Sequence, residues 1–201
     1  MSFRLFLCLF WGRNFQLASS DYRLGRYFLF VRGLNLFAYT GGATLAAAAA
    51  GAQVTHVDAS KGMVTWAKEN AVSSGLGDAP IRWLVDDCVK FVEREIRRGN
   101  TYDAIIMDPP SYGRGPKGEI WKIEDMIHPL IKLCTKILSK DALFFLVNSY
   151  TTGLAPAVLT YMISTELKPW NGHVDSQEIG LPVTDSGLVL PCGASGRWER
   201  D

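Results

Sequence analysis

Residues 33–58 read GLNLFAYTGGATLAAAAAGAQVTHVD, and this stretch decides the fold. The short apolar run Leu34–Tyr39 ends in Thr40-Gly41-Gly42 and is followed by the alanine-rich, helix-favouring run Ala43–Ala52. Val54–Asp58 is a second short apolar run. This order predicts a strand, a glycine turn, a helix and a second strand, which is the unit of a parallel sheet.

The same alternation continues along the chain. Further strands are predicted at Ile81–Val85, Tyr102–Met107 and Ala142–Asn148, and helices at Met63–Ser73, Cys88–Arg98, Ile123–Leu138 and Ala157–Leu167. A polar Gly/Pro loop is expected from Asp108 through Gly118, and antiparallel strands at Ser176–Leu181, Gly187–Cys192 and Ser195–Glu199. The expected fold is therefore α/β, with a doubly wound, mostly parallel sheet and antiparallel C-terminal strands.

The length and the ends of the chain indicate one domain. The chain has 201 residues, and we divide it into an irregular N-terminal segment, 1–32, and a domain over 33–201. The apolar run Leu5–Trp11 is short for a signal peptide and no small-residue cleavage site follows it. No apolar run approaches the roughly 20 residues that span a bilayer, so we expect no membrane association.

Composition excludes several classes of protein. The chain has 21 basic and 20 acidic residues, which argues against disorder and against binding to nucleic acid through overall positive charge. Cys8, Cys88, Cys134 and Cys192 show no CxxC spacing, which favours a reducing compartment over a zinc site or a disulfide framework. His56, His128 and His173 share no metal-ligand spacing, so no metal is expected.

Three strand ends suggest a nucleoside site. The two glycines after the first strand let a ligand approach the backbone closely, although GxGxxG is absent because Tyr39 stands at its first glycine. Asp58 ends the second strand and either accepts ribose hydroxyls or caps the next helix. Asp86-Asp87-Cys88 ends the third, where it either reads an adenine edge or favours a helix N-terminus. Together they predict a pocket for a cofactor that contains adenosine.

The fourth strand end, Asp108-Pro109-Pro110-Ser111-Tyr112, carries the sharpest signal. Two prolines make a rigid turn that can aim the Asp108 carboxylate and nearby carbonyls at one amino group, and Tyr112 offers a face on which a base can stack. The alternative is a rigid loop without a ligand. Arg114, Lys117 and Lys122 either contact phosphates or belong to a solvated loop, and Gly113, Gly115 and Gly118 suggest that this loop moves.

These runs, with YDAIIMDPPSYGRGPKGEIWK at 102–122 and GLPVTDSGLVLPCGASGRWE at 180–199, resemble the bacterial class I S-adenosylmethionine-dependent methyltransferases grouped with the large-subunit ribosomal RNA methyltransferases. The resemblance covers roughly residues 33–200. It implies S-adenosylmethionine as cofactor, ribosomal RNA as substrate and a cytoplasmic location. The residues it implies for the methionine moiety are Asn35, Phe37, Ala38, Tyr39, Thr40, Gly41 and Gly42; for the ribose Asp58, Ala59 and Ser60; for the adenine Asp86, Asp87 and Cys88; and for the methyl group and substrate Asp108, Pro109 and Pro110.

The sequence departs from this family at its N-terminus. Family members usually carry a further region ending in a Phe-Pro-Glu-Gln-like motif, which residues 1–32 lack, so the chain is expected to be truncated or altered there. One alternative is therefore a cofactor-binding remnant without activity. A nicotinamide-dependent oxidoreductase is a second alternative, disfavoured by the missing GxGxxG.

The cysteines bear on the mechanism. Cytosine-C5 methylation needs a cysteine nucleophile, and neither Asp108–Ser111 nor Asn148–Thr152 contains one. We therefore expect direct transfer to a nitrogen, in the first place an exocyclic amine, and keep C5 chemistry as an alternative.

Overall fold

A computed structural model describes residues 31–114, 120–151 and 153–201. The predictions for residues 1–30, including Cys8 and the apolar run, and for Gly115, Lys117 and Gly118 lie outside the described residues. The division into 1–32 and 33–201 stays a prediction.

The described chain alternates strands and helices. The strands are β1 Arg32–Leu36, β2 Gln53–Asp58, β3 Ile81–Val85, β4 Ala104–Met107, β5 Tyr112–Arg114, β6 Ile120–Lys122, β7 Phe144–Ser149, β8 His173–Pro182 and β9 Val189–Glu199. The helices are α3 Gly42–Ala49, α4 Lys61–Ser73, α5 Cys88–Arg98, α6 Ile123–Thr135 and α7 Pro156–Glu166.

Seven strands form one sheet in the order β3-β2-β1-β4-β7-β9-β8. The five strands from β3 to β7 pair in parallel, whereas β9 pairs antiparallel with both β7 and β8. The expected doubly wound sheet with antiparallel C-terminal strands is confirmed. The chain runs outward from β1 to β3 and then returns to β4, so the topological switch point lies between β1 and β4.

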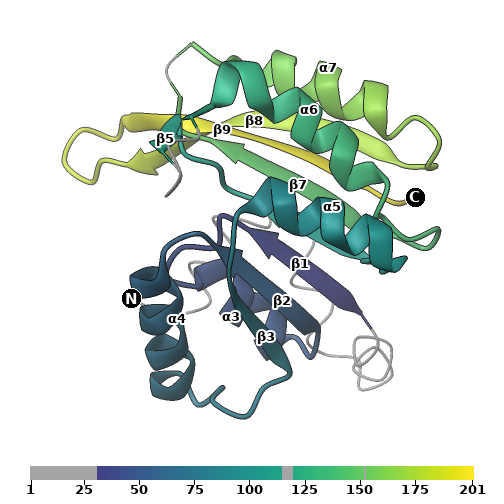
Figure 1. The fold of residues 1–201 in the computed structure, drawn as a ribbon. Coiled ribbons are helices and arrows are strands. Elements are labelled where there is room, and N and C mark those ends of the chain that lie inside the picture. The colour runs from purple at the N-terminus through teal and green to yellow at the C-terminus, as the bar shows by residue number, and fades with distance from the viewer. Residues whose placement is uncertain (1–30, 115–119, 152) are drawn as a thin grey trace.

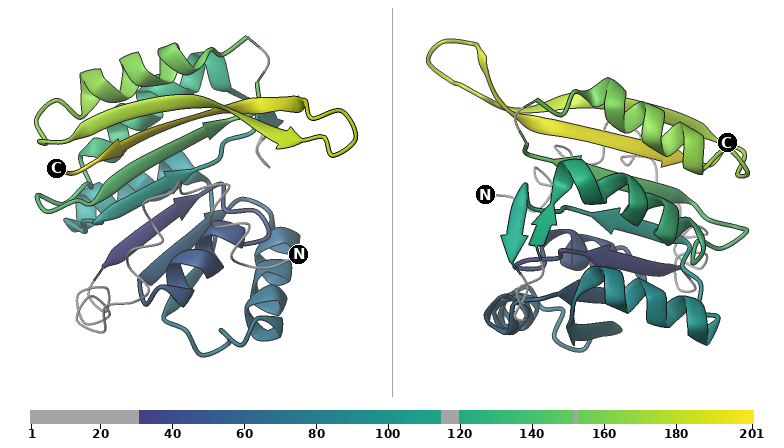
Figure 2. Two further views of the ribbon diagram at one scale, coloured as in Figure 1. Left: turned by 180° about the vertical axis from the view of Figure 1, so that it is seen from behind. Right: turned by 45° about the horizontal axis from the view of Figure 1, so that its top comes forward.

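The sheet is a middle layer between helices. Figure 1 shows α3 and α4 on one face, and Figure 2 shows α5, α6 and α7 side by side on the other. The side chains toward α5–α7 are apolar: Leu34, Leu36, Ile105, Met107, Phe145 and Val147 are each at most 1% exposed. Because side chains alternate along a strand, the face toward α3 carries a different set, which includes Asn35 and His56.

Local sequence explains the helix boundaries. Ser60 and Asp87 cap α4 and α5, accepting hydrogen bonds from Met63 N and Lys90 N. Gly99 ends α5 in the left-handed conformation (φ 68°).

The structure corrects several predicted boundaries. The first strand ends at Leu36 and not at Tyr39, because Phe37 and Tyr39 already have positive φ. The C-terminal part of the chain contains one long strand, β9, where two strands were expected. Helix α6 stops at Thr135 and not at Leu138. The predicted polar loop after Asp108 was wrong in part, because Tyr112–Arg114 and Ile120–Lys122 pair as an antiparallel hairpin.

Candidate active site at the carboxyl edge of the sheet

The loop after β1 is tightly wound. Phe37, Tyr39 and Gly41 all have positive φ (54°, 49° and 87°), and Gly41 N donates to Ala38 O at 3.0 Å. Non-glycine residues with positive φ are uncommon and mark loops held in place by their surroundings. The loop therefore has one defined shape at the switch point.

Gly41 also packs against the next helix. A Cβ atom at this position would lie 3.1 Å from Ala67 Cβ in α4. The left-handed φ and this close approach both favour glycine, which explains its place in the turn.

Helix α3 begins without a side-chain cap. Its N-cap is Gly41, no side chain accepts a hydrogen bond there, and no acidic residue lies in its first turn. Helices α4 and α5, by contrast, are capped by Ser60 and Asp87. The free N–H groups and the positive end of the α3 dipole are suited to an anion such as a carboxylate.

Asp58, at the end of β2, fastens the loop. Its Oδ2 accepts from Tyr39 N at 2.9 Å, and its Oδ1 accepts from Ser60 N at 2.8 Å. Each carboxylate oxygen has a second lone pair, so Asp58 can still accept the two hydroxyls of a ribose. The N-cap of α4 is Ser60 and not Asp58, and the prediction that Asp58 accepts the ribose hydroxyls is compatible with its two observed contacts.

The third strand end is largely occupied by structural contacts. Asp86 forms an ion pair with Arg94, and Asp87 caps α5. Cys88 is 4% exposed, and its Sγ accepts from Phe37 N at 3.3 Å. Burial raises the pKa of the Cys88 thiol well above its usual range, so the thiol stays neutral. An adenine contact here remains a prediction for the backbone and for Asp86 and Asp87.

A buried polar chain beneath the glycine loop was not predicted. Asn35 Nδ2 donates to Thr44 Oγ1 at 2.9 Å, and Thr44 Oγ1 lies 2.9 Å from His56 Nδ1. All three are nearly inaccessible, and burial lowers the pKa of His56 to about 4. Asn70 Nδ2 donates to Thr40 O at 3.0 Å, which further supports the loop. The sequence offered one signal for this chain of contacts, namely that the polar residues Asn35 and His56 stand within apolar strand patterns.

Asp108 is the most unusual group at the fourth strand end. Its Oδ1 is buried and has no hydrogen-bond partner among the described residues. Burial raises the pKa of this carboxyl to about 6. A buried acceptor without a partner carries a desolvation cost, so its persistence points to an external donor.

The β5–β6 hairpin folds back toward the glycine loop. Trp121 Nε1 donates to Pro110 O at 2.7 Å, and the ring centroids of Trp121 and Phe37 are 5.0 Å apart. Tyr112 begins the hairpin and is half-exposed, with its hydroxyl accepting from Arg114 Nε at 2.9 Å. The structure therefore brings the first and fourth strand ends together through aromatic contact.

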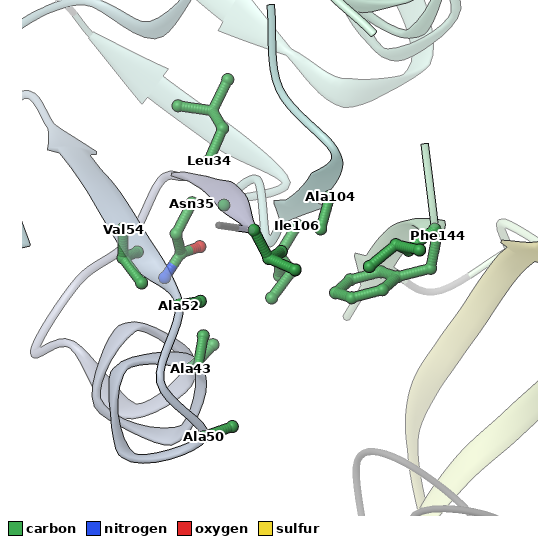
Figure 3. Close-up of a pocket in the computed structure, with 13 residues that line it drawn as sticks. Leu34, Asn35, Ala43, Ala50, Ala52, Val54, Ala104, Ile106 and Phe144 are labelled. Carbon is green, nitrogen blue, oxygen red and sulfur yellow. The ribbon is translucent and has the colours of Figure 1, made fainter. Parts of the chain in front are cut away.

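A small cavity lies elsewhere. It is formed between α3 and the sheet by residues that include Ala43, Ala50, Val54, Ile106 and Phe144 (Figure 3). Its walls are apolar apart from Asn35, and several come from the amino ends of the strands. It is not the predicted cofactor site, which lies at the opposite edge.

Within residues 31–114, 120–151 and 153–201, no three His, Cys, Asp or Glu side chains are arranged to hold a metal ion. In the same part of the chain, none of the helices has the length and apolar character to span a membrane. His128 lies 2.8 Å from Glu166 and is engaged in that pair.

The family follows from comparison with known proteins. The family model described as S-adenosylmethionine-dependent methyltransferase matches residues 2–163. The chain belongs to the S-adenosylmethionine-dependent methyltransferase family. The resemblance and the fold class inferred from the sequence are thereby confirmed, and the family is not that of the nicotinamide-dependent oxidoreductases, the disfavoured alternative.

Individual relatives agree with this family. Over 106 residues the chain is 37% identical to the ribosomal RNA large subunit methyltransferase K/L of Shewanella frigidimarina, covering 50% of this chain and 15% of that protein. It is 32% identical over 120 residues to the ribosomal RNA large subunit methyltransferase K of Neisseria meningitidis, covering 59% and 34%. The chain therefore spans about a third or less of the length of these curated relatives.

Solved methyltransferases share the fold. The crystal structure of the SAM-dependent methyltransferase from Agrobacterium tumefaciens has a TM-score of 0.80 and 43% identity, covering 85% of this chain and 56% of that one. The magnesium protoporphyrin IX methyltransferase of Synechocystis, solved with bound SAM, is 13% identical with a TM-score of 0.58, covering 84% and 69%, and shows the fold alone.

The residues present fit the family's cofactor. The open N-terminus of α3 is suited to the methionine carboxylate, and Asp58 retains lone pairs for the ribose hydroxyls. The unpartnered Asp108 oxygen lies at the end of β4, the strand next to β1.

Proposed function

We propose that this domain transfers a methyl group from S-adenosylmethionine to a base of RNA, with ribosomal RNA as the substrate class and the cytoplasm as its location. The observation that carries the proposal is the buried, unpartnered Asp108 oxygen beside the switch point. The printed names of the curated relatives support the choice of RNA.

The cofactor is held by three strand ends in this proposal. The Asn35–Gly42 loop and the first turn of α3 receive the methionine moiety, and Asp58 with Ala59 and Ser60 receives the ribose. Asp86, Asp87 and the backbone at Cys88 border the adenine. The family's cofactor supplies an electrophilic methyl group on a positively charged sulfur.

Asp108 orients the acceptor. Its ionised carboxylate accepts an N–H of the base amine, which directs the nitrogen lone pair toward the methyl carbon. When bound, the cofactor would supply its methyl group to this nitrogen and would keep the electron pair of the carbon–sulfur bond on its sulfur. The proton that nitrogen loses passes to the Asp108 carboxylate and then to water. Pro109 and Pro110 keep this turn rigid, and Tyr112 stacks on the base.

A methyl-transfer assay tests the proposal. Unmodified ribosomal RNA is incubated with labelled S-adenosylmethionine and digested to nucleosides. Label in a methylated base supports the proposal, and Asp108→Ala should abolish this label while it keeps most of the cofactor affinity. Cofactor affinity without incorporation into any RNA would favour a cofactor-binding remnant instead.

One observation favours cytosine-C5 chemistry as a second candidate. Cys192 lies in β9 near the carboxyl end of β7, and it is only partly buried, unlike Cys88 and Cys134. Burial raises the pKa of Tyr150 to about 12, with smaller contributions from Asp108 and Cys192 nearby, so all three side chains lie in one region. Cys192→Ser should leave transfer intact if the acceptor is a nitrogen, and should abolish it if Cys192 attacks the ring.

A further inference from the structure

Asn148 lies next to Asp108 across two parallel strands. The register of β4 and β7 ends with Met107 opposite Val147, so Asp108 and Asn148 are the next residues along each strand. Asp108 N still donates to Leu36 O at 3.4 Å, which shows that the sheet geometry continues through Asp108.

Both side chains lie on the α3 side of the sheet. Ile106 and Phe144 line the cavity on that side, where Figure 3 shows them close together. Asp108 and Asn148 follow these residues by two and by four positions. Since side chains alternate along strands, both continue the same face toward the carboxyl edge.

Asn148 shares the unusual state of Asp108. It is 2% exposed, and its Oδ1 has no hydrogen-bond partner among the described residues, as is true of Asp108 Oδ1. Buried acceptors are almost always paired, so two orphaned oxygens on adjacent strand ends are improbable as a packing accident. Two neighbouring acceptors are the complement of two N–H donors.

We infer that Asn148 is a substrate-positioning residue, and that Asn148 and Asp108 together hold a base edge that presents two N–H donors. This inference rests on the proposed function and deepens it. The base edges that qualify carry an amino group, as in adenine, cytosine and guanine. Uracil and the ribose 2′-hydroxyl offer a single donor each and should be rejected.

Alanine replacement tests the role of Asn148. Asn148→Ala should lower kcat/KM for RNA methylation by about ten- to a hundred-fold, the range for one lost hydrogen bond at a buried site, while S-adenosylmethionine affinity stays within about two-fold. Asn100→Ala is the matched control, because Asn100 bonds Glu95 at the opposite edge of the sheet and should leave transfer unchanged. If Asn148→Ala does not fold, Asn148→Ser replaces it with the same expectation.

A base analogue separates recognition from a structural role. Once the methylated nucleoside is known, it is replaced in a transcript by its analogue without the amino group. A transcript without this amine cannot be methylated there, so its affinity is measured by competition with the natural transcript. Wild-type protein should bind the analogue more weakly, and Asn148→Ala should lose at least about ten-fold of that difference in affinity, because its acceptor is already missing. A variant that is only misfolded would lose affinity for both transcripts equally.

Failure of the proposed function and failure of the inference about Asn148 give different results in these experiments. Wild-type protein that methylates no RNA overturns the proposed function and this inference with it. An active wild type overturns the inference alone if Asn148→Ala keeps full activity, loses cofactor affinity in proportion, or discriminates as wild type does. A methylated uridine or a 2′-O-methylated ribose also overturns the inference alone.

Discussion

The backbone N–H of Tyr39 donates a 2.9 Å hydrogen bond to Asp58 Oδ2, which joins the loop after β1 to the end of β2. The other oxygen of the same carboxylate holds Ser60 N at 2.8 Å, at the start of α4. One side chain thus fixes the relative position of two strand ends and still has lone pairs with which it can accept the ribose hydroxyls in the proposed function. Loop geometry and cofactor recognition depend on the same residue.

Asp58→Ala should therefore weaken cofactor binding more than a single lost ribose contact would. The variant loses both the ribose acceptor and the support for Tyr39, and we expect the Kd for S-adenosylmethionine to rise by about a hundred-fold, equivalent to about 3 kcal/mol. Titration calorimetry measures this. Asp78→Ala, on an exposed surface, is the control. A change in Kd of less than about three-fold in Asp58→Ala would show that Asp58 is only a helix-end residue.

Gly41→Ala should perturb the site, whereas Gly75→Ala should cost stability alone. Both glycines have left-handed φ values, 87° and 72°, so both substitutions strain the backbone by about 1 kcal/mol. A Cβ at Gly41 would meet Ala67 at 3.1 Å, but at Gly75 nothing lies within 4 Å. Denaturation and cofactor titration of both variants separate the effect of the contact with Ala67 from the backbone strain that the two variants share. Equal effects of the two variants on cofactor affinity would contradict the tight packing of the glycine turn.

Asp108→Asn should stabilise the protein while it slows transfer, because the amide can still accept an N–H but cannot take a proton. Burial raises the pKa of Asp108 to about 6 from the usual 3.8, so the folded state disfavours the ionised form. This group makes stability fall as pH rises from about 4 through 6, by on the order of 3 kcal/mol. The amide removes the charge, and we expect a gain of about 2 kcal/mol at pH 8 and none at pH 4, measured by urea unfolding.

The activity of the wild-type protein should rise with pH over the same range in which its stability falls, because both depend on the ionisation of Asp108. Only the ionised carboxylate can take the proton that the substrate nitrogen loses, and it is also the stronger acceptor of the N–H, so kcat/KM should decline as pH falls through about 6. A profile that stays flat from pH 7.5 to 5 would exclude Asp108 as the proton acceptor.

His56 should make the fold sensitive to acid. Burial lowers the pKa of His56 to about 4, whereas the unfolded chain binds a proton near 6.5. The neutral form therefore contributes stability that is present in full above pH 6.5 and is lost as pH falls toward 4. The loss amounts to about 2 kcal/mol at pH 5. His56→Gln cannot titrate, so its stability should change less between pH 7 and 5. An identical pH dependence in both proteins would exclude His56 as its source.

The sequence predicted the elements whose signals are local. Ile81–Val85 and Cys88–Arg98 were placed to the residue, because the first is an apolar run between Pro80 and Asp86 and the second lies between the Asp87 cap and Gly99. The end of β1 was misplaced, since Phe37 and Tyr39 are residues typical of strands and adopt positive φ only because tertiary contacts hold them there. The β5–β6 hairpin was missed for a similar reason. Three-residue strands have too little periodicity to detect, and Trp121 is held by its bond to Pro110.

The candidate site was predictable in outline for a topological reason. Parallel strands end at one edge, so Asp58, Asp87 and Asp108 could be expected there from their order alone. The roles of the supporting residues could not be predicted from the sequence, because pairs such as Thr44 with His56 are contacts between different elements. Asn148 was read as the last residue of a strand, and only the register with β4 places it beside Asp108.

A crystal structure of the protein with S-adenosylhomocysteine would test the central claim most directly. We expect both ribose hydroxyls within hydrogen-bond distance of the Asp58 carboxylate, the amino-acid carboxylate at the N-terminus of α3, and the sulfur facing Asp108. A ligand bound at the apolar cavity instead, or an Asp58 carboxylate without contact to the ribose, would contradict the account.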